Sequence, residues 1–145
     1  MTEELTQKEK STLQVVDKMN EEVYQKGNLD AIDELVAEDF QHHAPFPTPQ
    51  GREGFKGFQT QFQQAFPDGY STNQDIIVDG DRVAVRYTMR ATHKGEFMDI
   101  PATNKDVEVE GISIYRVENG KIAEEWAQPD LMGLMQQMGV VQQPA

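Results

Sequence analysis

The sequence predicts an α+β domain: a cone of three N-terminal helices packed in a curved, mostly antiparallel sheet, followed by a short C-terminal helix. Two patterns indicate this class. Apolar residues recur at three- and four-residue steps through residues 4–66, and β-rich runs dominate residues 71–126. The 145 residues have the length of one domain and contain no repeat or linker. We therefore expect residues 1–145 to form a single domain.

Apolar periodicity predicts the helices over residues 4–25, 29–37, 51–66 and 131–138. The first is expected to end at Gly27, and Asn28 is expected to cap the second. An aromatic stripe runs along the third: Phe55, Phe58, Phe62 and Phe66. This stripe is expected to pack in the core and to supply part of a pocket wall.

Alternating β-rich runs predict strands over residues 39–44, 71–78, 82–93, 107–117 and 121–126. The last two flank the turn at residues 118–120 and form a hairpin. The apolar phase changes at Gly111, which predicts a β-bulge there.

Composition restricts the function. The net charge of −12 argues against binding to nucleic acid or to membrane surfaces. The chain has no Cys, no phosphate-binding loop and three histidines without matching carboxylates, so we expect neither a metal nor an organic cofactor. The acidic start and the lack of a long apolar run predict a cytoplasmic protein.

Few residues are candidates for chemistry. His42 and His43 are adjacent on a predicted strand, so at most one faces a pocket. His93 shares a strand face with Tyr87 and is either a hydrogen-bonded core residue or a proton donor. Asp130 precedes the last helix and is either its N-cap or a general acid/base with a raised pKa.

The C-terminal hairpin, its Trp126 and the following Pro129-Asp130 resemble the signature of the SnoaL-like polyketide cyclase family, within the nuclear transport factor two-like superfamily. The segments GNLDAIDELVAEDFQHHAP, GREGFKGFQTQFQQAFPD, RVAVRYTMRATHKGEF and LMGLMQQMGVV also resemble that family, so the resemblance covers nearly the whole chain. It implies a cone-shaped fold. It also implies a homodimer formed through the sheet face that carries Arg86 to Thr92.

In the family, an Asp at the position of Asp130 is the general acid/base of a cofactor-free aldol ring closure. His42 falls at a polar pocket position, and Arg116 falls where a catalytic-site His is expected. Arg cannot exchange protons near neutral pH, so Arg116 would instead bind an enolate or a carboxylate. The expected pocket wall consists of Trp126, Tyr87, Met89, Phe58 and Phe62.

These residues predict an enzyme in which Asp130 moves a proton next to the carbonyl of a small or medium apolar substrate, while His42, His93 or Arg116 stabilises the enolate. Isomerase, dehydratase and epoxide hydrolase chemistry stay open, and epoxide opening would need a second carboxylate. The alternative is a non-catalytic dimer, either structural or binding a small molecule. It follows if Asp130 is only a cap and the cone is filled by Met and Phe.

Overall fold

In the computed structural model, which describes residues 4–140, five strands form one sheet in the order β1-β5-β4-β3-β2. The strands are β1 (Val36–His43), β2 (Tyr70–Asp79), β3 (Arg82–Thr92), β4 (Asp106–Glu118) and β5 (Lys121–Pro129). β1 pairs with β5 in parallel, and the other neighbouring strands pair in antiparallel fashion. The predicted mostly antiparallel sheet is confirmed.

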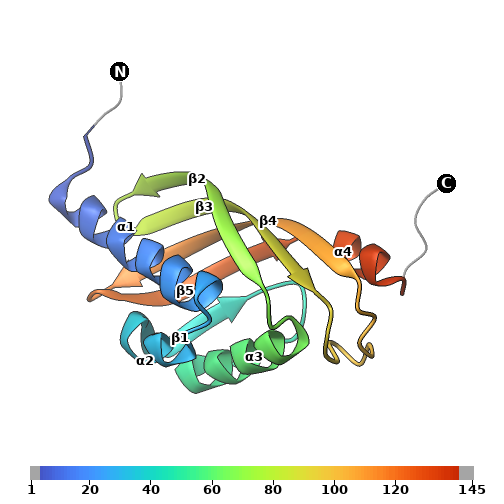
Figure 1. Cartoon of the computed structure of the whole chain (residues 1–145). Helices are drawn as coiled ribbons and strands as arrows, with labels where there is room; N and C mark the ends of the chain where they lie inside the picture. Colours follow the sequence, from blue (N-terminus) through green and yellow to red (C-terminus); the bar gives the residue numbers. More distant parts are fainter. Residues whose placement is uncertain (1–3, 141–145) are drawn as a thin grey trace.

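The helices are α1 (Gln7–Met19), α2 (Ile32–Leu35), α3 (Gly51–Ala65) and α4 (Leu131–Met138). A π-helical segment, Asn20–Gln25, extends α1, and a 3₁₀ turn, Leu29–Ala31, precedes α2. The curved sheet arches over α1, α2 and α3, and α4 follows the end of β5 and lies against the start of β4 (Figure 1). The predicted α+β cone is therefore confirmed.

Local sequence explains where the outer helices begin. Thr6 and Glu9 form a capping box, in which each side chain accepts a hydrogen bond from the other residue's backbone N–H, at 3.1 and 3.0 Å. α4 begins at the residue after Asp130 and ends at Gly139, which adopts the left-handed conformation common at helix ends. The bounds predicted for α4 are confirmed.

The second predicted helix is too long, because the chain leaves the helix at Leu35 and enters β1 at Val36. Val36 pairs with Ile122 on β5 and is fully buried. β-branched residues such as Val favour strands, and here strand pairing overrides the helical periodicity of residues 29–37.

The predicted bulge at Gly111 is wrong. β4 pairs with β3 without a register shift from Asp106 to Arg116, and every odd-numbered residue from Val107 to Val117 is buried. Ile112 and Ile114 instead lie exposed on the outer face of the sheet. The register shift of this strand occurs against β5, between Arg116 and Val117.

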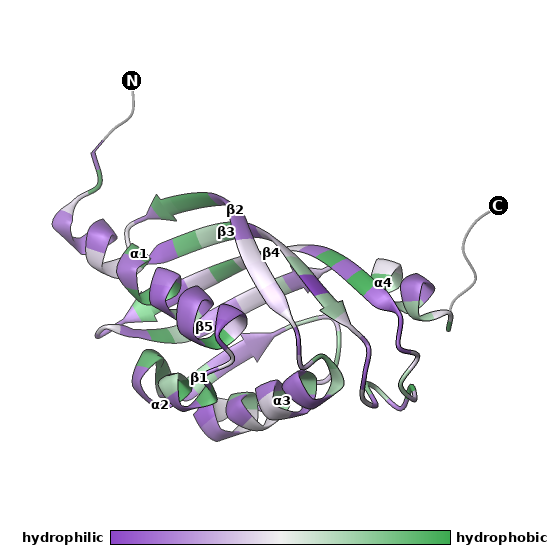
Figure 2. Cartoon of the chain, in the orientation of Figure 1, coloured by the Kyte–Doolittle hydropathy of each residue, from purple (hydrophilic) through white to green (hydrophobic). Residues whose placement is uncertain are grey.

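The core has two parts inside the cone. One lies between α1, α2 and the middle of the sheet around Phe40 and Phe55, and the other lies between the end of α3 and α4 around Phe66 and Leu134. α1 and α3 alternate between hydrophilic and hydrophobic residues, as expected of helices with one face on a core (Figure 2). Within residues 4–140, no helix has the length and apolar character needed to span a bilayer.

Candidate active site

A cavity of about 150 Å³ lies inside the cone, between α1, α3, α4 and the inner face of the sheet. This volume is roughly ten times the space that one water molecule needs. Its walls are mostly apolar, with a few polar groups, which is the usual composition of a small-molecule site. The polar residues that line it are Asn20, Tyr24, His42, Gln59, Ser71, Asn73, Tyr87, Ser113, Tyr115 and Glu125.

Glu125 is a carboxylic acid at the floor of this cavity. Strand alternation turns it inward from β5, and it pairs with Tyr115 on β4 and with His42 on β1. The residue is 5% exposed, and burial raises its pKa to about 7, although hydrogen bonds from Ser113 and Tyr115 oppose that rise. Glu125 therefore exists in both protonation states near neutral pH and is able to take up or release a proton there.

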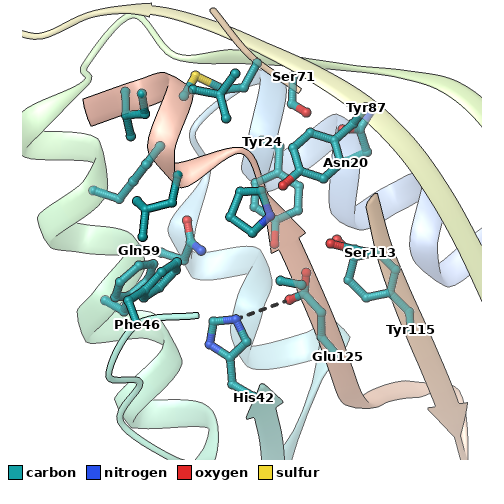
Figure 3. A pocket seen from close by; sticks show the side chains of 18 of the residues that line it. Asn20, Tyr24, His42, Phe46, Gln59, Ser71, Tyr87, Ser113, Tyr115 and Glu125 are labelled. Atoms are coloured by element: carbon teal, nitrogen blue, oxygen red, sulfur yellow. Dashed lines mark ion pairs between the residues drawn. The ribbon is translucent and has the colours of Figure 1, made fainter. Parts of the chain in front are cut away.

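His42 lies beside Glu125, with 3.7 Å between its Nε2 atom and Oε1 of the carboxyl group (Figure 3). Its ring packs among Phe40, Phe55 and Phe58. Burial, with a smaller contribution from the charge of His43, lowers the pKa of His42 to about 4. The imidazole is thus neutral near pH 7, and one of its nitrogens carries a proton that it is able to donate in a hydrogen bond.

The backbone of His42 is held in place by the loop that follows β1. The Gln50 side chain accepts a hydrogen bond from the His42 N–H at 3.1 Å and donates one to the His42 carbonyl at 2.9 Å. Thr48 donates a further hydrogen bond to the same carbonyl. These contacts hold the backbone from which the imidazole projects toward Glu125. As predicted, His42 and His43 face opposite sides of the sheet.

Four hydroxyl groups line the cavity together with the carboxyl group of Glu125: those of Tyr24, Tyr87, Ser113 and Tyr115. Burial raises the pKa of all three tyrosines, and for Tyr87 the value is about 12. They are therefore protonated at neutral pH and available as hydrogen-bond donors.

Four residues expected in the pocket wall do line the cavity: Phe58, Phe62, Tyr87 and Met89. Phe46, from the loop after β1, stacks on Phe58 with 5.3 Å between ring centroids and continues this apolar wall. The cone is therefore not filled by its Phe and Met residues. Their contact with a substrate remains a prediction.

The placement predicted for Asp130 is wrong, and the N-cap interpretation is confirmed. Its side chain is exposed and accepts a hydrogen bond from the Gly133 N–H at 2.9 Å, at the start of α4. Asp130 does not line the cavity. The free N–H groups at a helix start attract a carboxylate, and this interaction holds the side chain in solvent.

Arg116 and Trp126 do not reach the cavity either, because strand alternation places both on the outer face of the sheet. Arg116 forms ion pairs with Glu118 and Glu124, at 2.8 and 3.1 Å. Trp126 stacks on His43, and Arg82 lies over its ring. Their predicted positions beside the pocket are wrong.

His93 is a fully buried core residue. Its Nδ1 atom lies 3.0 Å from the Thr103 hydroxyl, and its ring packs on Phe66. It does not line the cavity, so the hydrogen-bonded core interpretation is confirmed and its predicted place at the site is wrong.

Sequence reasoning missed Glu125, Ser113, Tyr115 and Tyr24. One signal pointed to Glu125: on β5 it stands between Ala123 and Ala127, which alternation assigns to the same face as the charged residue. Among residues 4–140, no group of three His, Cys, Asp or Glu side chains is arranged to hold a metal ion. The expectation that no cofactor is needed remains untested.

Comparison with known proteins identifies the family of the chain. A family model described as SnoaL-like polyketide cyclase matches residues 14–138. The aklanonic acid methyl ester cyclase DauD of Streptomyces sp. strain C5 is 26% identical over 128 residues, which cover 81% of this chain and 76% of DauD.

Solved structures are also similar. IdmH of Streptomyces antibioticus is 35% identical, with a TM-score of 0.76 and coverage of 89% of this chain and 99% of IdmH. TsrD of Streptomyces laurentii is 27% identical, with a TM-score of 0.82 and coverage of 95% and 100%. Because the family model spans most of its length, the chain belongs to the SnoaL-like polyketide cyclase family.

Proposed function

We propose that this protein is a cofactor-independent enzyme that moves a proton next to the carbonyl group of an apolar substrate, with Glu125 as the general acid/base. The observation that supports this most strongly is the buried carboxyl group of Glu125, with a pKa of about 7, on the floor of an open apolar cavity. A general acid/base works best when its pKa lies near the working pH.

In the proposed reaction, the Glu125 carboxylate removes a proton from the carbon next to the substrate carbonyl, and an enolate forms. Neutral His42 and the nearby tyrosine hydroxyls supply hydrogen bonds to the developing negative charge. The enolate carbon then attacks a second carbonyl of the same molecule and closes a ring. The proton held by Glu125 passes to the new alkoxide, so Glu125 returns to its starting state and no proton is consumed.

The substrate class follows from the walls and from the relatives. Phe46, Phe58, Phe62 and Met89 offer flat, apolar surface to a ring system, and Glu125 is the single carboxylate among the described residues that line the cavity. This arrangement does not support epoxide opening, for which a second carboxylate would be needed to activate water. Two curated relatives are named aklanonic acid methyl ester cyclases, so a neutral polyketide ester is the first substrate to test.

The test measures two reactions with three proteins. Aklanonic acid methyl ester is assayed for ring closure, and a simple aromatic 1,3-diketone is assayed for exchange of its α-proton with deuterium by NMR. The wild type is compared with Glu125→Gln and with the control Glu124→Gln, which changes the neighbouring carboxylate on the outer face.

Loss of the general base is expected to slow both reactions by about 10²–10⁴-fold in Glu125→Gln. Glu124→Gln should stay near the wild-type rate. Wild-type protein that binds either compound tightly but accelerates neither reaction would instead support the non-catalytic binding function. Full activity in Glu125→Gln would exclude Glu125 as the acid/base.

A further inference from the structure

Asn20, a polar residue of the cavity wall, has no role in the proton transfer described above and, within residues 4–140, is left with an unpaired amide oxygen. Among the described residues, five buried side-chain polar atoms have no hydrogen-bond partner, and two of them belong to residues that line the cavity: His42 Nδ1 and Asn20 Oδ1. His42 already belongs to the proposed site, because its other ring nitrogen, Nε2, faces Glu125. Buried polar atoms are nearly always hydrogen-bonded, so the unpaired amide oxygen of Asn20 requires its own explanation.

Asn20 is held in the wall by an unusual helical turn. It is the first residue of the π-helical segment that extends α1. Val16, Asn20 and Tyr24 follow each other at four-residue steps, and all three line the cavity. Short π-helical segments occur frequently at functional sites.

Two further uncharged polar residues line the cavity on the strand at the edge of the sheet. Ser71 and Asn73 of β2 line the same cavity, and Asn73 pairs with Tyr87 across the sheet. In Figure 3, Asn20 and Ser71 lie toward the upper end of the cavity, whereas His42 lies at its lower end. The cavity thus has a second polar region, apart from the floor on which Glu125 lies.

We propose that Asn20, with Ser71 and Asn73, forms a subsite for a hydroxyl group of the substrate, remote from the carbonyl on which Glu125 acts. A primary amide offers one acceptor and one donor group, and a hydroxyl group both donates and accepts. A hydroxyl therefore satisfies Asn20 whichever way its amide is turned. A carboxylate fits less well, because it has no hydrogen to donate to the unpaired amide oxygen and would place a second acidic group in a low-dielectric cavity with Glu125.

The region has room for more than the hydroxyl itself. Tyr24, Gln59 and Ser71 also line a second, smaller cavity of about 100 Å³, between the π-helical segment, α3 and the start of β2. A substituent carried near the hydroxyl would extend into this space. The inference relies on the proposed function only in taking the main cavity as the substrate site.

The test measures binding, so it does not depend on turnover. Calorimetry compares 2-naphthol with the 2,3-, 2,6- and 2,7-dihydroxynaphthalenes, which place a second hydroxyl at different points of the same ring system. The proteins are the wild type, Asn20→Leu, which keeps the shape but removes the amide, and the control Gln14→Leu. Gln14 lies on the exposed side of α1.

The wild type and Gln14→Leu should bind at least one of the three diols about tenfold or more tightly than 2-naphthol, as expected for one added hydrogen bond to a buried partner. Asn20→Leu should lose this preference and keep its affinity for 2-naphthol. Equal affinity of the wild type across the series, failure of every compound to bind, or a preference that survives in Asn20→Leu would overturn the subsite. Loss of acid/base activity on Glu125→Gln is measured separately, so the two proposals fail independently.

Discussion

The carboxyl group of Glu125 and the imidazole of His42 lie side by side on the cavity floor, 3.7 Å apart, because β1 and β5 pair in parallel with these two residues in register. The same burial acts on them in opposite directions. It raises the pKa of the acid to about 7 and lowers the pKa of the base to about 4. Near pH 7 the carboxyl group of Glu125 is therefore protonated in about half of the molecules, beside an imidazole ring that is neutral.

The pKa of Glu125 sets the pH dependence of the proposed reaction. The carboxylate is the form that removes the proton, so kcat/KM should rise between pH 6 and pH 8, with an apparent pKa near 7. His42 is neutral throughout this range and adds no inflection. Initial rates of α-proton exchange over this range check the prediction. A profile that is flat from pH 6 to 8, or that rises only near pH 4, would assign the proton transfer to another group.

The same two groups should influence the pH dependence of stability with opposite signs. Raising the folded-state pKa of Glu125 from 4.5 to about 7 stabilises the fold at low pH, and this contribution is lost as pH rises through 7. Lowering the folded-state pKa of His42 from 6.5 to about 4 gives a contribution to stability that is fully present above pH 6.5. This contribution is lost as pH falls toward 4. Between pH 4.5 and 6.5 the two effects nearly cancel.

Single variants should separate the two opposing contributions to the pH dependence of the unfolding free energy. Relative to the wild type, Glu125→Gln should gain stability as pH rises from 4.5 to 8, by on the order of 3 kcal/mol in total. His42→Gln should gain a similar amount, again relative to the wild type, as pH falls from 6.5 to 4. Urea denaturation at several pH values measures both. Variants that run parallel to the wild type at every pH would show that neither pKa is shifted.

Asp130 should matter for stability and not for chemistry. Asp130→Ala removes the N-cap of α4 and should cost about 0.5–2 kcal/mol of unfolding free energy, whereas Asp130→Asn should cost little, since Asn caps nearly as well. Both variants should keep wild-type rates of α-proton exchange below their melting temperatures. A large loss of activity in Asp130→Asn, with stability intact, would return the acid/base role to Asp130.

The fold was predictable because its helices and most of its strands follow the ordinary apolar patterns. The site was not predictable, because there polar residues face inward and apolar residues face outward, which is the reverse of the usual pattern. On β4 after Val109, the buried inner-face residues are Gly111, Ser113 and Tyr115, of which Ser113 and Tyr115 line the cavity, and the isoleucines between them face outward. Polar groups of the cavity occupy the inner face of the sheet here, and apolar side chains occupy the outer face. The apparent phase change at Gly111 was this inversion and not a bulge.

The same inversion explains the misplaced residues on β5. Its large aromatic residue, Trp126, suggested an inward face, but the neighbouring Glu125 is the inward residue, 5% exposed. The register shift between β4 and β5 after Arg116 places one extra residue on β5. The alternation of inward and outward residues along a regular strand does not predict this. Asp130 follows the strand end, where the start of α4 determines its direction.

The protein should form a homodimer through the outer face of the sheet. Five residues lie in one row across the sheet, each paired with the next, and four of them are apolar: Ile77, Ala84, Ile114, Trp126 and His43. Ile77 is 69% exposed. Because an exposed apolar row is unfavourable in water, we expect the outer face of a second copy of the protein to cover it. Sedimentation at micromolar concentration should show a dimer. Ile77→Lys should weaken it, and Ile76→Lys, on the opposite face of the same strand, should not. A monomeric wild type would refute the dimer.

Gly111 should be required for the position of Tyr87. The two residues pair across β3 and β4, and a Cβ atom on Gly111 would overlap the phenol of Tyr87. Gly111→Ala should therefore displace the ring into the cavity, cost about 1–3 kcal/mol of stability and raise KM. Gly57→Ala is the matched control, because a Cβ there meets no atom within 4 Å and the exposed helix position should gain up to about 1 kcal/mol.

A double-mutant cycle identifies the cause of that cost. If the clash with Tyr87 is responsible, Gly111→Ala should cost clearly less stability in a Tyr87→Leu background than in the wild type, because Leu lacks the atoms that the new methyl group meets. Urea denaturation of the four proteins gives the coupling. An unchanged cost in the Tyr87→Leu background would mean that the new methyl group acts on the backbone of Pro129, whose Cα atom lies 3.0 Å from the same position.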